Sequence, residues 1–508
     1  MKHRRILSGL AALLLLANLP VSALAAEWDI GNGDITVNAG SGGQTVTQGS
    51  QVDVPDSAPV ITGSSTENTV TINAEKDQTA SVTLSGANID GSTKGNAAVS
   101  TTGEGNVSIE LDGDNTLKSG KGHAGLEKKN GGKLTIADED KNGKLTAEGG
   151  KYGAGIGGGD QGAGSGITIT GGEIKATGGQ YGAGIGGGKG DGSDITISGG
   201  EVNATGGTSG AGIGGGYNGN GSDITITDGE VNATGGKYGA GIGGGEYGIG
   251  KDIIITGGEV NATGGRFSAG IGGGSRGTGS DITISGGEVN ASGGVNGAGI
   301  GGGLRSKGKD ITVSGDTKLK VQGGDEDHYD GAGAGIGDGG SNAYGTKILG
   351  AEVEPDTSGL TTGRIEYYAP GADMDKDAPS QTIVGTYTPP QPAREAAAPA
   401  QPAAPLYRVT DGDGKDVSYE TTWRDGVLTV TVEADRAVLT GRLSGIASLQ
   451  AHGIERIVFI TKGATSEFLT ADLLAAAPAT ERYALSHDGE AVTFTAGEAD
   501  VSGILVKA

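Results

Sequence analysis

Four aspartates recur in the middle of the chain, each two residues after a glycine and directly before an isoleucine. They are Asp194, Asp223, Asp252 and Asp281. Carboxylate oxygens are ligands that Ca²⁺ prefers in proteins, and the Gly-x-Gly-x-Asp spacing is similar to that of calcium-binding β-helix repeats, although the apolar residue comes one place earlier here. The same aspartates could instead accept backbone N–H bonds and stabilise turns. The pattern therefore predicts a column of calcium ligands or a column of turn residues.

A second acidic column is formed by Glu201, Glu230 and Glu259, which each open the segment Glu-Val-Asn-Ala-Thr. If these segments are stacked strands about 4.8 Å apart, neighbouring carboxylates repel by about 0.9 kcal/mol even in water. They must then point into solvent, share cations or bind a ligand. We take the three glutamates as candidate substrate-binding residues.

A third column is aromatic and precedes the heptapeptide Gly-Ala-Gly-Ile-Gly-Gly-Gly in successive units. Its members are Tyr152, Tyr181, Tyr238 and Phe267, and basic or amide side chains stand directly before them. Aromatic rings beside an extended surface can stack on sugar rings. The alternative is that the rings only cover a glycine-rich corner. We take the four aromatic residues as candidate polysaccharide-binding residues.

Two motifs typical of enzymes occur, but the glycine content accounts for both. The dinucleotide fingerprint at Gly153, Gly155 and Gly158 recurs in most later units and precedes no predicted helix. The nucleophile-elbow pattern around Ser275 occurs in one unit, and other residues take the place of this serine elsewhere. The insertion 325–330 gathers acidic residues around His328, as a metal or catalytic site or as a solvated end-cap loop. We predict no catalytic residue and expect a protein that is not an enzyme.

The three columns imply a repeating fold that holds equivalent residues in register. The isoleucine of the heptapeptide recurs at spacings of 28 or 29 residues, at Ile156, Ile185, Ile213, Ile242, Ile271 and Ile300. Each unit contains three short segments of period-two alternation, each closed by glycines. This pattern predicts an all-β, right-handed parallel β-helix with three short strands per turn of about 29 residues. We expect about nine or ten turns over residues 27–345, with the most regular repeats at about 150–310.

The alternation also assigns the side chains to the two faces of each strand. In the unit that begins near Ser193, Val202 and Ala204 should point inward while Glu201 points outward. Gly212, between two inward residues, should leave a bare surface. Glycines at the corners should supply the positive φ that a tight turn needs.

The composition indicates which kinds of partner and which cellular location to expect. The chain has 508 residues, 107 glycines, no cysteine and a formal charge of −24. The negative charge argues against nucleic acid as a partner, and the absence of cysteine excludes disulfides and thiol chemistry. Residues 1–26 join a basic start to an apolar stretch and a small-residue cleavage pattern, which is typical of a secretion signal. We therefore expect a secreted protein, extracellular or at the cell surface, that does not insert into membranes.

The C-terminal part differs in composition from the repeats. Residues 346–387 should form an irregular end cap, and residues 388–405 a Pro/Ala-rich linker. Residues 406–508 should form a small α+β domain with strands near Val427 and Ile454, a helix over 467–476 and a hairpin over 483–495. We find no site in it, and attachment to a cell-surface partner is a guess at its role.

The repeat unit itself carries a family resemblance. Units of the form Ile-Thr-Ile-Ser-Gly-Gly, Glu-Val-Asn-Ala-Thr-Gly-Gly and a Gly-rich Ala-Gly-Ile turn, over about residues 60–345, resemble the pectate-lyase-like carbohydrate-binding right-handed β-helix family of clostridia and related Firmicutes. The resemblance implies calcium-assisted binding of plant polysaccharide without cleavage. Because that family's acidic Asp-Asp-Gly-Ile turn is replaced by Ala-Gly-Ile, no metal ligand is carried over.

Three functions follow from these patterns. The first is a secreted, non-catalytic protein that binds a plant or host polysaccharide, with calcium as a possible cofactor, because a polymer can engage many equivalent turns. The second is a structural or adhesive rod at the cell surface. The third is a polysaccharide lyase or glycoside hydrolase, which requires a unique set of acid and base groups that the repeats do not offer.

Overall fold

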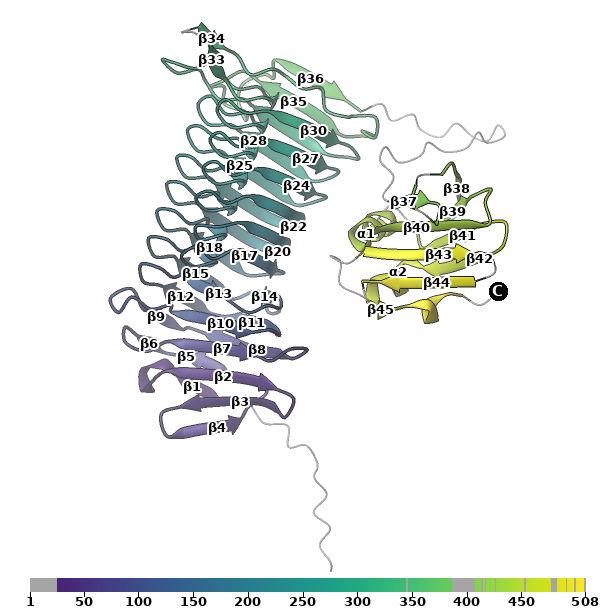
Figure 1. Ribbon diagram of the computed structural model, residues 1–508. Helices are drawn as coiled ribbons and strands as arrows, with labels where there is room; N and C mark the ends of the chain where they lie inside the picture. The colour runs from purple at the N-terminus through teal and green to yellow at the C-terminus, as the bar shows by residue number, and fades with distance from the viewer. Residues whose placement is uncertain are drawn as a thin grey trace, which may run out of the picture. The chain divides into compact units, whose positions relative to one another are not determined.

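The computed structural model describes residues 25–385 and 407–506, except residues 344–345, 413, 416, 425, 452–453, 477–481, 490 and 498. The chain divides into two compact units, and the first ends at Gly385. This first unit is a parallel β-solenoid, the elongated stack of turns that runs from purple to green in Figure 1. The expected signal peptide lies almost entirely outside the described residues, and the expected linker 388–405 lies wholly outside them.

The shorter sheet of the solenoid shows how the turns are stacked. Each of its parallel strands pairs with the strand one turn further along the chain. There are eleven of them among the described residues, more than the nine or ten turns expected, because the N-terminal turns fold in the same way without the heptapeptide. They are β2 (Ile35–Gly40), β7 (Val70–Ala74), β10 (Val99–Gly103), β13 (Leu126–Lys128), β16 (Ile156–Gly157), β19 (Ile185–Gly186), β21 (Ile213–Gly214), β23 (Ile242–Gly243), β26 (Ile271–Gly272), β29 (Ile300–Gly301) and β32 (Ile336–Gly337).

The larger, 21-stranded sheet contains the other two strand segments of each turn. In most turns these are separate strands, and they merge into single 14-residue strands in β20 and β22. Three strand segments per turn are therefore confirmed, two of them in one sheet. The members of this sheet are β1 (Glu27–Asp29), β5 (Val60–Thr62), β6 (Ser64–Ser65), β8 (Thr79–Ser85), β9 (Asn88–Asp90), β11 (Asn106–Asp112), β12 (Asp114–Lys118), β14 (Leu134–Ala137), β15 (Lys144–Glu148), β17 (Gly164–Ile169), β18 (Glu173–Thr177), β20 (Gly192–Thr205), β22 (Gly221–Thr234), β24 (Gly250–Ile255), β25 (Glu259–Thr263), β27 (Gly279–Ile284), β28 (Glu288–Ser292), β30 (Gly308–Val313), β31 (Lys318–Gln322), β35 (Arg364–Tyr368) and β36 (Gln381–Val384).

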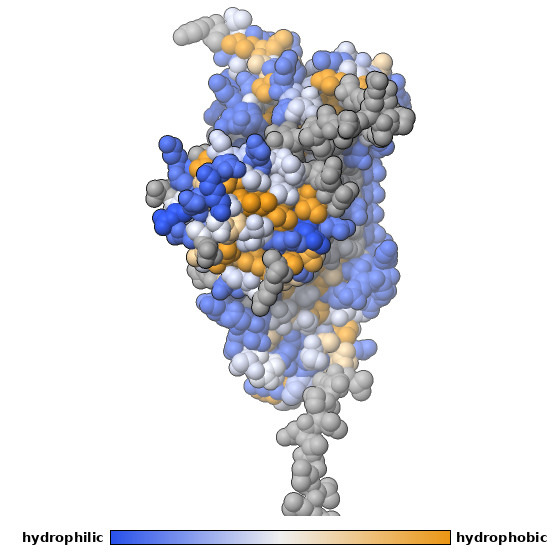
Figure 2. Space-filling model, turned by 90° about the vertical axis from the view of Figure 1, so that its right-hand side faces the viewer, coloured by the Kyte–Doolittle hydropathy of each residue, from blue (hydrophilic) through white to orange (hydrophobic). Residues whose placement is uncertain are grey.

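The core of the solenoid is a stack of isoleucine, valine and alanine. Val202 is fully buried and Ala204 is 1% exposed, whereas Glu201 of the same strand is exposed. The expected assignment of inward and outward residues is therefore confirmed in this turn. A fully buried valine or isoleucine contributes about 1.5–3 kcal/mol, so many small apolar side chains replace the large aromatic core that the chain lacks. The visible parts of the solenoid in Figure 2 are accordingly coloured mainly as hydrophilic.

The glycines are explained mainly by close backbone packing, which differs from expectation. All residues from Gly210 to Gly216 are buried, so Gly212 does not leave a bare surface. A Cβ on Gly236 would lie 1.5 Å from the carbonyl oxygen of Gly207 in the preceding turn. Positive φ is needed at fewer positions, such as Gly214 with φ of 128°. Most repeat glycines are thus required because backbone stacks directly on backbone, and side chains have no space there.

Both ends of the solenoid are closed by antiparallel strands. At the N-terminal end, β3 (Gly43–Gln48) pairs antiparallel with β2, and β4 (Gln51–Pro55) pairs with β3. At the C-terminal end, β35 still stacks in parallel on β31, and β36 then pairs antiparallel with β35. A hairpin of β33 (Ser341–Ala343) and β34 (Thr346–Ile348) lies before them in the chain. The segment expected to be an irregular end cap therefore adds one further parallel strand to the stack.

The second unit contains two small sheets and two helices. Its five-stranded sheet and its four-stranded sheet enclose the aromatic side chains of Phe459, Phe468, Tyr483 and Phe494. Its elements are β37 (Tyr407–Thr410), β38 (Glu420–Arg424), β39 (Val427–Thr431), β40 (Arg436–Arg442), α1 (Leu443–Ala451), β41 (Arg456–Ile460), β42 (Thr465–Leu469), α2 (Thr470–Ala476), β43 (Arg482–Asp488), β44 (Ala491–Ala496) and β45 (Ala499–Asp500).

One helix of this unit begins later in the chain than the sequence predicted. The helix expected over 467–476 begins at Thr470, because residues 467–469 complete strand β42. Phe468 pairs with Ile457 of β41 and is fully buried, so burial in the sheet outweighs the helical propensity of the segment. In the part of the chain that the structure describes, no helix has the length and apolar character needed to cross a membrane.

A buried histidine connects the two sheets of this unit. His487 of β43 is 1% exposed. Its Nδ1 lies 3.0 Å from Thr461 Oγ1, and its Nε2 lies 2.8 Å from Ser466 Oγ. Phe459 packs against the imidazole at a centroid distance of 4.7 Å. Because burial removes water and no charged group replaces it in these contacts, the pKa of His487 is lowered to about 4.

Candidate functional site

The aromatic column lies where the chain enters and leaves the buried heptapeptide. The residue after the heptapeptide lies against the residue before it in the preceding turn. Tyr217 N–H donates to the carbonyl of Tyr181 over 2.8 Å, and Ser275 N–H donates to the carbonyl of Tyr238 over 2.9 Å. At this corner the solenoid thus presents two series of side chains, one before the heptapeptide and one after it. We call the six aromatic residues there the aromatic corner: Tyr152, Tyr181, Tyr217, Tyr238, Tyr247 and Phe267.

The rings of the aromatic corner pack on one another along the stack. Tyr152 and Tyr181 stack with centroids 5.4 Å apart and planes 18° apart. Tyr238 and Phe267 stack at 5.7 Å and 14°. One face of each of these four rings is therefore covered by a neighbour. A sugar cannot lie flat on that face, so its contacts are limited to the other ring faces, the ring edges, the phenol hydroxyls and the groups around them.

Two members of the aromatic corner were not expected from the sequence. Tyr217 packs edge-on against Tyr181 at 5.5 Å, and Tyr247 packs edge-on against Tyr217 at 6.2 Å. Both follow the heptapeptide, whereas the expected column precedes it, and only the hydrogen bonds between turns bring the two series together. Tyr247 is 47% exposed and has the most open ring of the corner.

Six cations surround these rings, in two groups. In the first cation group, the Nζ atoms of Lys189, Lys151 and Lys121 lie 5.0, 5.2 and 5.5 Å from the ring centroid of Tyr152. The second cation group consists of Lys237, Arg266 and Arg276, which lie 4.9, 5.0 and 5.8 Å from the rings of Tyr238, Phe267 and Tyr247. Such contacts contribute about 0.5–1 kcal/mol each at exposed sites, and they hold the cationic heads beside the rings.

Two carboxylates lie within the same corner. Asp160 Oδ1 lies 3.5 Å from Lys189 Nζ. Glu246 Oε2 accepts a hydrogen bond of 2.7 Å from the hydroxyl of Ser209, which occupies the place of an aromatic residue between Tyr181 and Tyr238. The middle of the corner therefore offers an acceptor for hydroxyl groups, and cations lie on both sides of it.

The glutamate column lies on a different part of the solenoid surface. Glu201, Glu230 and Glu259 stand in exact parallel register and are exposed. Each begins its strand segment, whereas the aromatic column follows the end of that segment. The structure therefore places the two sets of candidate residues on separate surfaces. Among the described residues, these three glutamates have no cation within salt-bridge distance.

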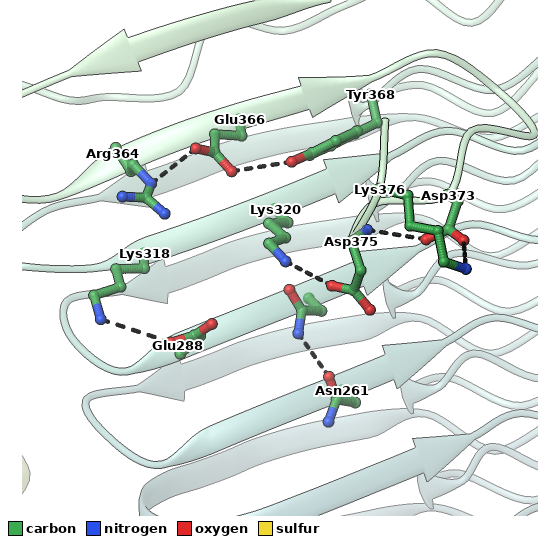
Figure 3. Close-up of polar contacts among 11 residues, drawn as sticks. Asn261, Glu288, Lys318, Lys320, Arg364, Glu366, Tyr368, Asp373, Asp375 and Lys376 are labelled. Atoms are coloured by element: carbon green, nitrogen blue, oxygen red, sulfur yellow. Dashed lines mark hydrogen bonds and ion pairs between the residues drawn. The ribbon is translucent and has the colours of Figure 1, made fainter. Parts of the chain in front are cut away.

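The ends of this face carry the charges that compensate the column. Glu173 pairs with Lys144 of the turn before it over 2.7 Å. Figure 3 shows the other end, where Glu288 pairs with Lys318 of the turn after it over 3.7 Å. Beyond Lys318, Arg364 pairs with Glu366 over 2.8 Å. The terminal glutamates are thus paired with lysines. Of the three central ones, Glu201 and Glu230 each accept one hydrogen bond from the asparagine two residues further on, over 3.0 and 3.4 Å, and the exposed carboxylates are otherwise open to solvent or a ligand.

An asparagine ladder runs beside the glutamates and holds neighbouring turns in register. The Nδ2 of each asparagine donates to the Oδ1 of the asparagine one turn earlier. The distances are 3.1 Å from Asn232 to Asn203, 2.9 Å from Asn261 to Asn232 and 2.7 Å from Asn290 to Asn261. Figure 3 shows Asn261 in this ladder. The ladder uses the amide groups for structure, so they are not available to a ligand.

The four aspartates take an unusual backbone conformation. Asp194, Asp223, Asp252 and Asp281 have φ between 50° and 55°, a left-handed region that aspartate tolerates better than most residues. Gly166 stands at the equivalent place in the preceding turn with φ of 68°. Local conformation therefore gives a reason for aspartate at these positions that requires neither calcium nor the expected turn, since the four residues lie within strands β20, β22, β24 and β27.

A different set of carboxylates has the spacing of a metal site. Glu110, Asp138 and Asp140 are, within the described ranges, the set of three whose oxygen atoms lie within 4.8 Å of one another. Glu110 accepts the N–H of Glu139 over 2.7 Å, and Asp138 accepts that of Gly143 over 3.1 Å. Two of the three carboxylates, those of Glu110 and Asp138, therefore already have a structural role as hydrogen-bond acceptors for the loop backbone.

A buried charged cluster lies beneath the first regular turn. Glu127 is 2% exposed and binds Lys129 Nζ at 2.6 Å and His123 Nδ1 at 2.9 Å. The neighbouring Lys128 is also buried, which lowers its pKa to about 8. A Cβ on Gly159 of the next turn would lie 2.2 Å from Glu127 Oε1. The cluster therefore fills the space under the Gly-rich loop of that turn.

The acidic insertion 325–330 is anchored to the solenoid. Arg305 donates to both oxygens of Asp330, over 2.9 and 3.0 Å. Partial burial tends to raise the pKa of Asp327, but the N–H groups of Asp330 and Tyr329 and the positive charge of Arg266 lower it overall. The insertion thus lies close enough to Arg266 to mark the C-terminal limit of the aromatic corner.

Comparison with known proteins agrees with this architecture. The family model of the Beta helix repeat matches residues 141–160, 167–189, 195–217, 224–246, 253–275 and 282–304. The chain therefore contains β-helix repeats, and the matched segments include most of the aromatic corner. No curated protein and no solved structure matches the chain.

Proposed function

We propose that this protein is secreted and binds a polysaccharide without cleaving it, along the aromatic corner. The observation that supports the proposal is the line of six rings, with polar and cationic partners, that follows successive turns. Turns spaced about 4.8 Å apart match the rise of about one sugar unit, so a chain laid along the corner can repeat its contacts. The signal-like residues 1–26 favour secretion, and residues 407–506 would serve attachment to a cell-surface partner.

The glutamate column is a secondary surface in this proposal. Glu201, Glu230 and Glu259 present exposed carboxylates without a salt-bridge partner among the described residues. Their oxygen atoms can accept hydrogen bonds from sugar hydroxyls or share calcium with an acidic glycan. Calcium assistance remains part of the proposal only at this surface, because conformation already explains the four aspartates.

Affinity electrophoresis against polygalacturonate, xylan and cellulose, with calcium and with chelator, tests the proposal. The full chain should be retarded by at least one glycan, and Tyr247→Ala and Tyr181→Ala should each weaken retention. Val52→Ala is the control, since Val52 is 64% exposed on strand β4 at the N-terminal end of the solenoid, outside the corner. Absence of retention on every glycan would favour a structural rod, and release of unsaturated or reducing ends would show an enzyme.

A further inference from the structure

The charge of the aromatic corner is opposite to that of the protein as a whole. The chain carries a formal charge of −24, yet this corner gathers six cations around its rings. Asp160 and Glu246 lie within it, and the acidic insertion with Asp327 borders it beside Arg266. Lys189 pairs with Asp160. Within the described residues, the other five cations have no carboxylate within salt-bridge distance. Arg266 is close enough to Asp327 of the insertion to lower the pKa of that carboxyl, so the charges of Lys121, Lys151, Lys237 and Arg276 are the ones most available to an anion.

The two cation groups are separated by a neutral to acidic middle. Tyr152 and Tyr238 lie three turns apart, which corresponds to about 14 Å along the stack. Between them stand Ser209 and the carboxylate of Glu246, joined by their hydrogen bond of 2.7 Å. An anionic group bound in the middle would meet Glu246, whereas hydroxyl groups there would find an acceptor.

We propose that the aromatic corner selects a linear polyanionic glycan, with carboxylate-bearing sugars at the two cation groups and sugar hydroxyls at Glu246. This inference rests on the proposed function and adds the charge class of the ligand. A nucleic acid fits less well, because base stacking needs open ring faces and the stacked rings here cover one another. Its denser charge, about one per 1.7 Å of duplex, would also be repelled by the acidic remainder of the chain.

Binding of the full chain to polygalacturonate and to its methyl ester tests the charge class, since the two polymers share a backbone and differ in charge. Calorimetry at low and high salt should show binding to the acid at least tenfold tighter than to the ester. Affinity for the acid should fall as salt rises. Equal affinity for the two polymers, without salt dependence, would overturn the inference and leave the proposed function intact. Binding to no glycan at all would remove both.

Variants locate the site. Lys151→Gln with Lys189→Gln should weaken binding to polygalacturonate about tenfold or more, and Arg276→Gln alone should weaken it severalfold. Lys309→Gln is the control, because Lys309 is exposed on strand β30, outside both the corner and the glutamate column, and it should change affinity less than twofold. An equal loss in the control, or none in the corner variants, would overturn the assignment. Duplex DNA bound as tightly as polygalacturonate would also overturn it, as unselective attraction of polyanions.

Discussion

Replacing a single repeat glycine by alanine should destabilise the solenoid strongly, even where its φ is ordinary. At Gly236 the added Cβ would lie 1.5 Å from the carbonyl oxygen of Gly207, and Cβ contacts in real structures are essentially never shorter than 3.0 Å. The two turns must therefore separate locally by roughly the difference, 3.0 − 1.5 = 1.5 Å. The Gly236 N–H bond to the Gly210 carbonyl, now 2.9 Å long, would then be lost.

The expected cost follows from these two effects. Overpacking costs about 1–3 kcal/mol, and a buried backbone group left without its partner costs about 1–3 kcal/mol more. Gly236→Ala should therefore lower the free energy of unfolding by roughly 2–6 kcal/mol. Because turns contact mainly their neighbours, the loss of protection should be greatest in the turns around residue 236.

Urea unfolding followed by far-ultraviolet circular dichroism, with hydrogen exchange to locate the change, measures this effect. Gly42→Ala is the control, since a Cβ there meets nothing within 4 Å, and Gly190→Ala is an intermediate case with its nearest atom at 3.2 Å. Stability should fall in the order Gly42→Ala, Gly190→Ala, Gly236→Ala. If Gly236→Ala were as stable as Gly42→Ala, close backbone packing would not be the reason for the glycines.

Three further changes test other parts of the molecule. The pKa of His487 is about 4 in the folded chain against 6.5 for the free side chain, so its contribution to stability is complete above pH 6.5 and is lost as the pH falls to about 4. The loss amounts to roughly 3 kcal/mol in the free energy of unfolding. Unfolding of the second unit, measured at a series of pH values, should show this loss, and His487→Gln should make the stability of the unit less dependent on pH. Asp252→Gly should leave the free energy of unfolding and the response to calcium unchanged. Asp252→Val should lower the free energy of unfolding by about 1–2 kcal/mol, because valine is strained in the left-handed conformation. If calcium raised the melting temperature and Asp252→Gly abolished that rise, the aspartate would be part of a metal site. Asn261→Ala should lower the free energy of unfolding by about 1–3 kcal/mol by interrupting the asparagine ladder, whereas Lys175→Ala on the same face should have little effect, and equal melting temperatures would contradict a structural role for the ladder.

The repeat pattern was sufficient to predict the class of fold and the direction of most side chains in it. Period-two alternation placed Val202 and Ala204 inside and Glu201 outside, and the structure confirms all three positions. The number of turns was underestimated because the first turns lack the heptapeptide. The helix expected at Glu467 failed for a different reason, since Phe468 gains more by pairing in a sheet than the segment gains as a helix.

The aromatic corner shows where the sequence stops being sufficient. Tyr152, Tyr181, Tyr238 and Phe267 were predicted from their constant place before the heptapeptide. Tyr217 and Tyr247 stand after it, in positions that change from unit to unit, so no period marks them.

By itself, the sequence determined the period, the identity of the buried isoleucine, valine and alanine residues of the repeats and the presence of three columns, because each depends on spacing along one chain. Only the tertiary structure decided which columns share a surface, which ring faces are covered and which cations lack a carboxylate partner. These properties depend on hydrogen bonds between turns, such as that from Tyr217 to Tyr181, which join residues on opposite sides of a buried loop. Close contacts between turns also explain the glycines, since the nearest atoms to most of them belong to a neighbouring turn.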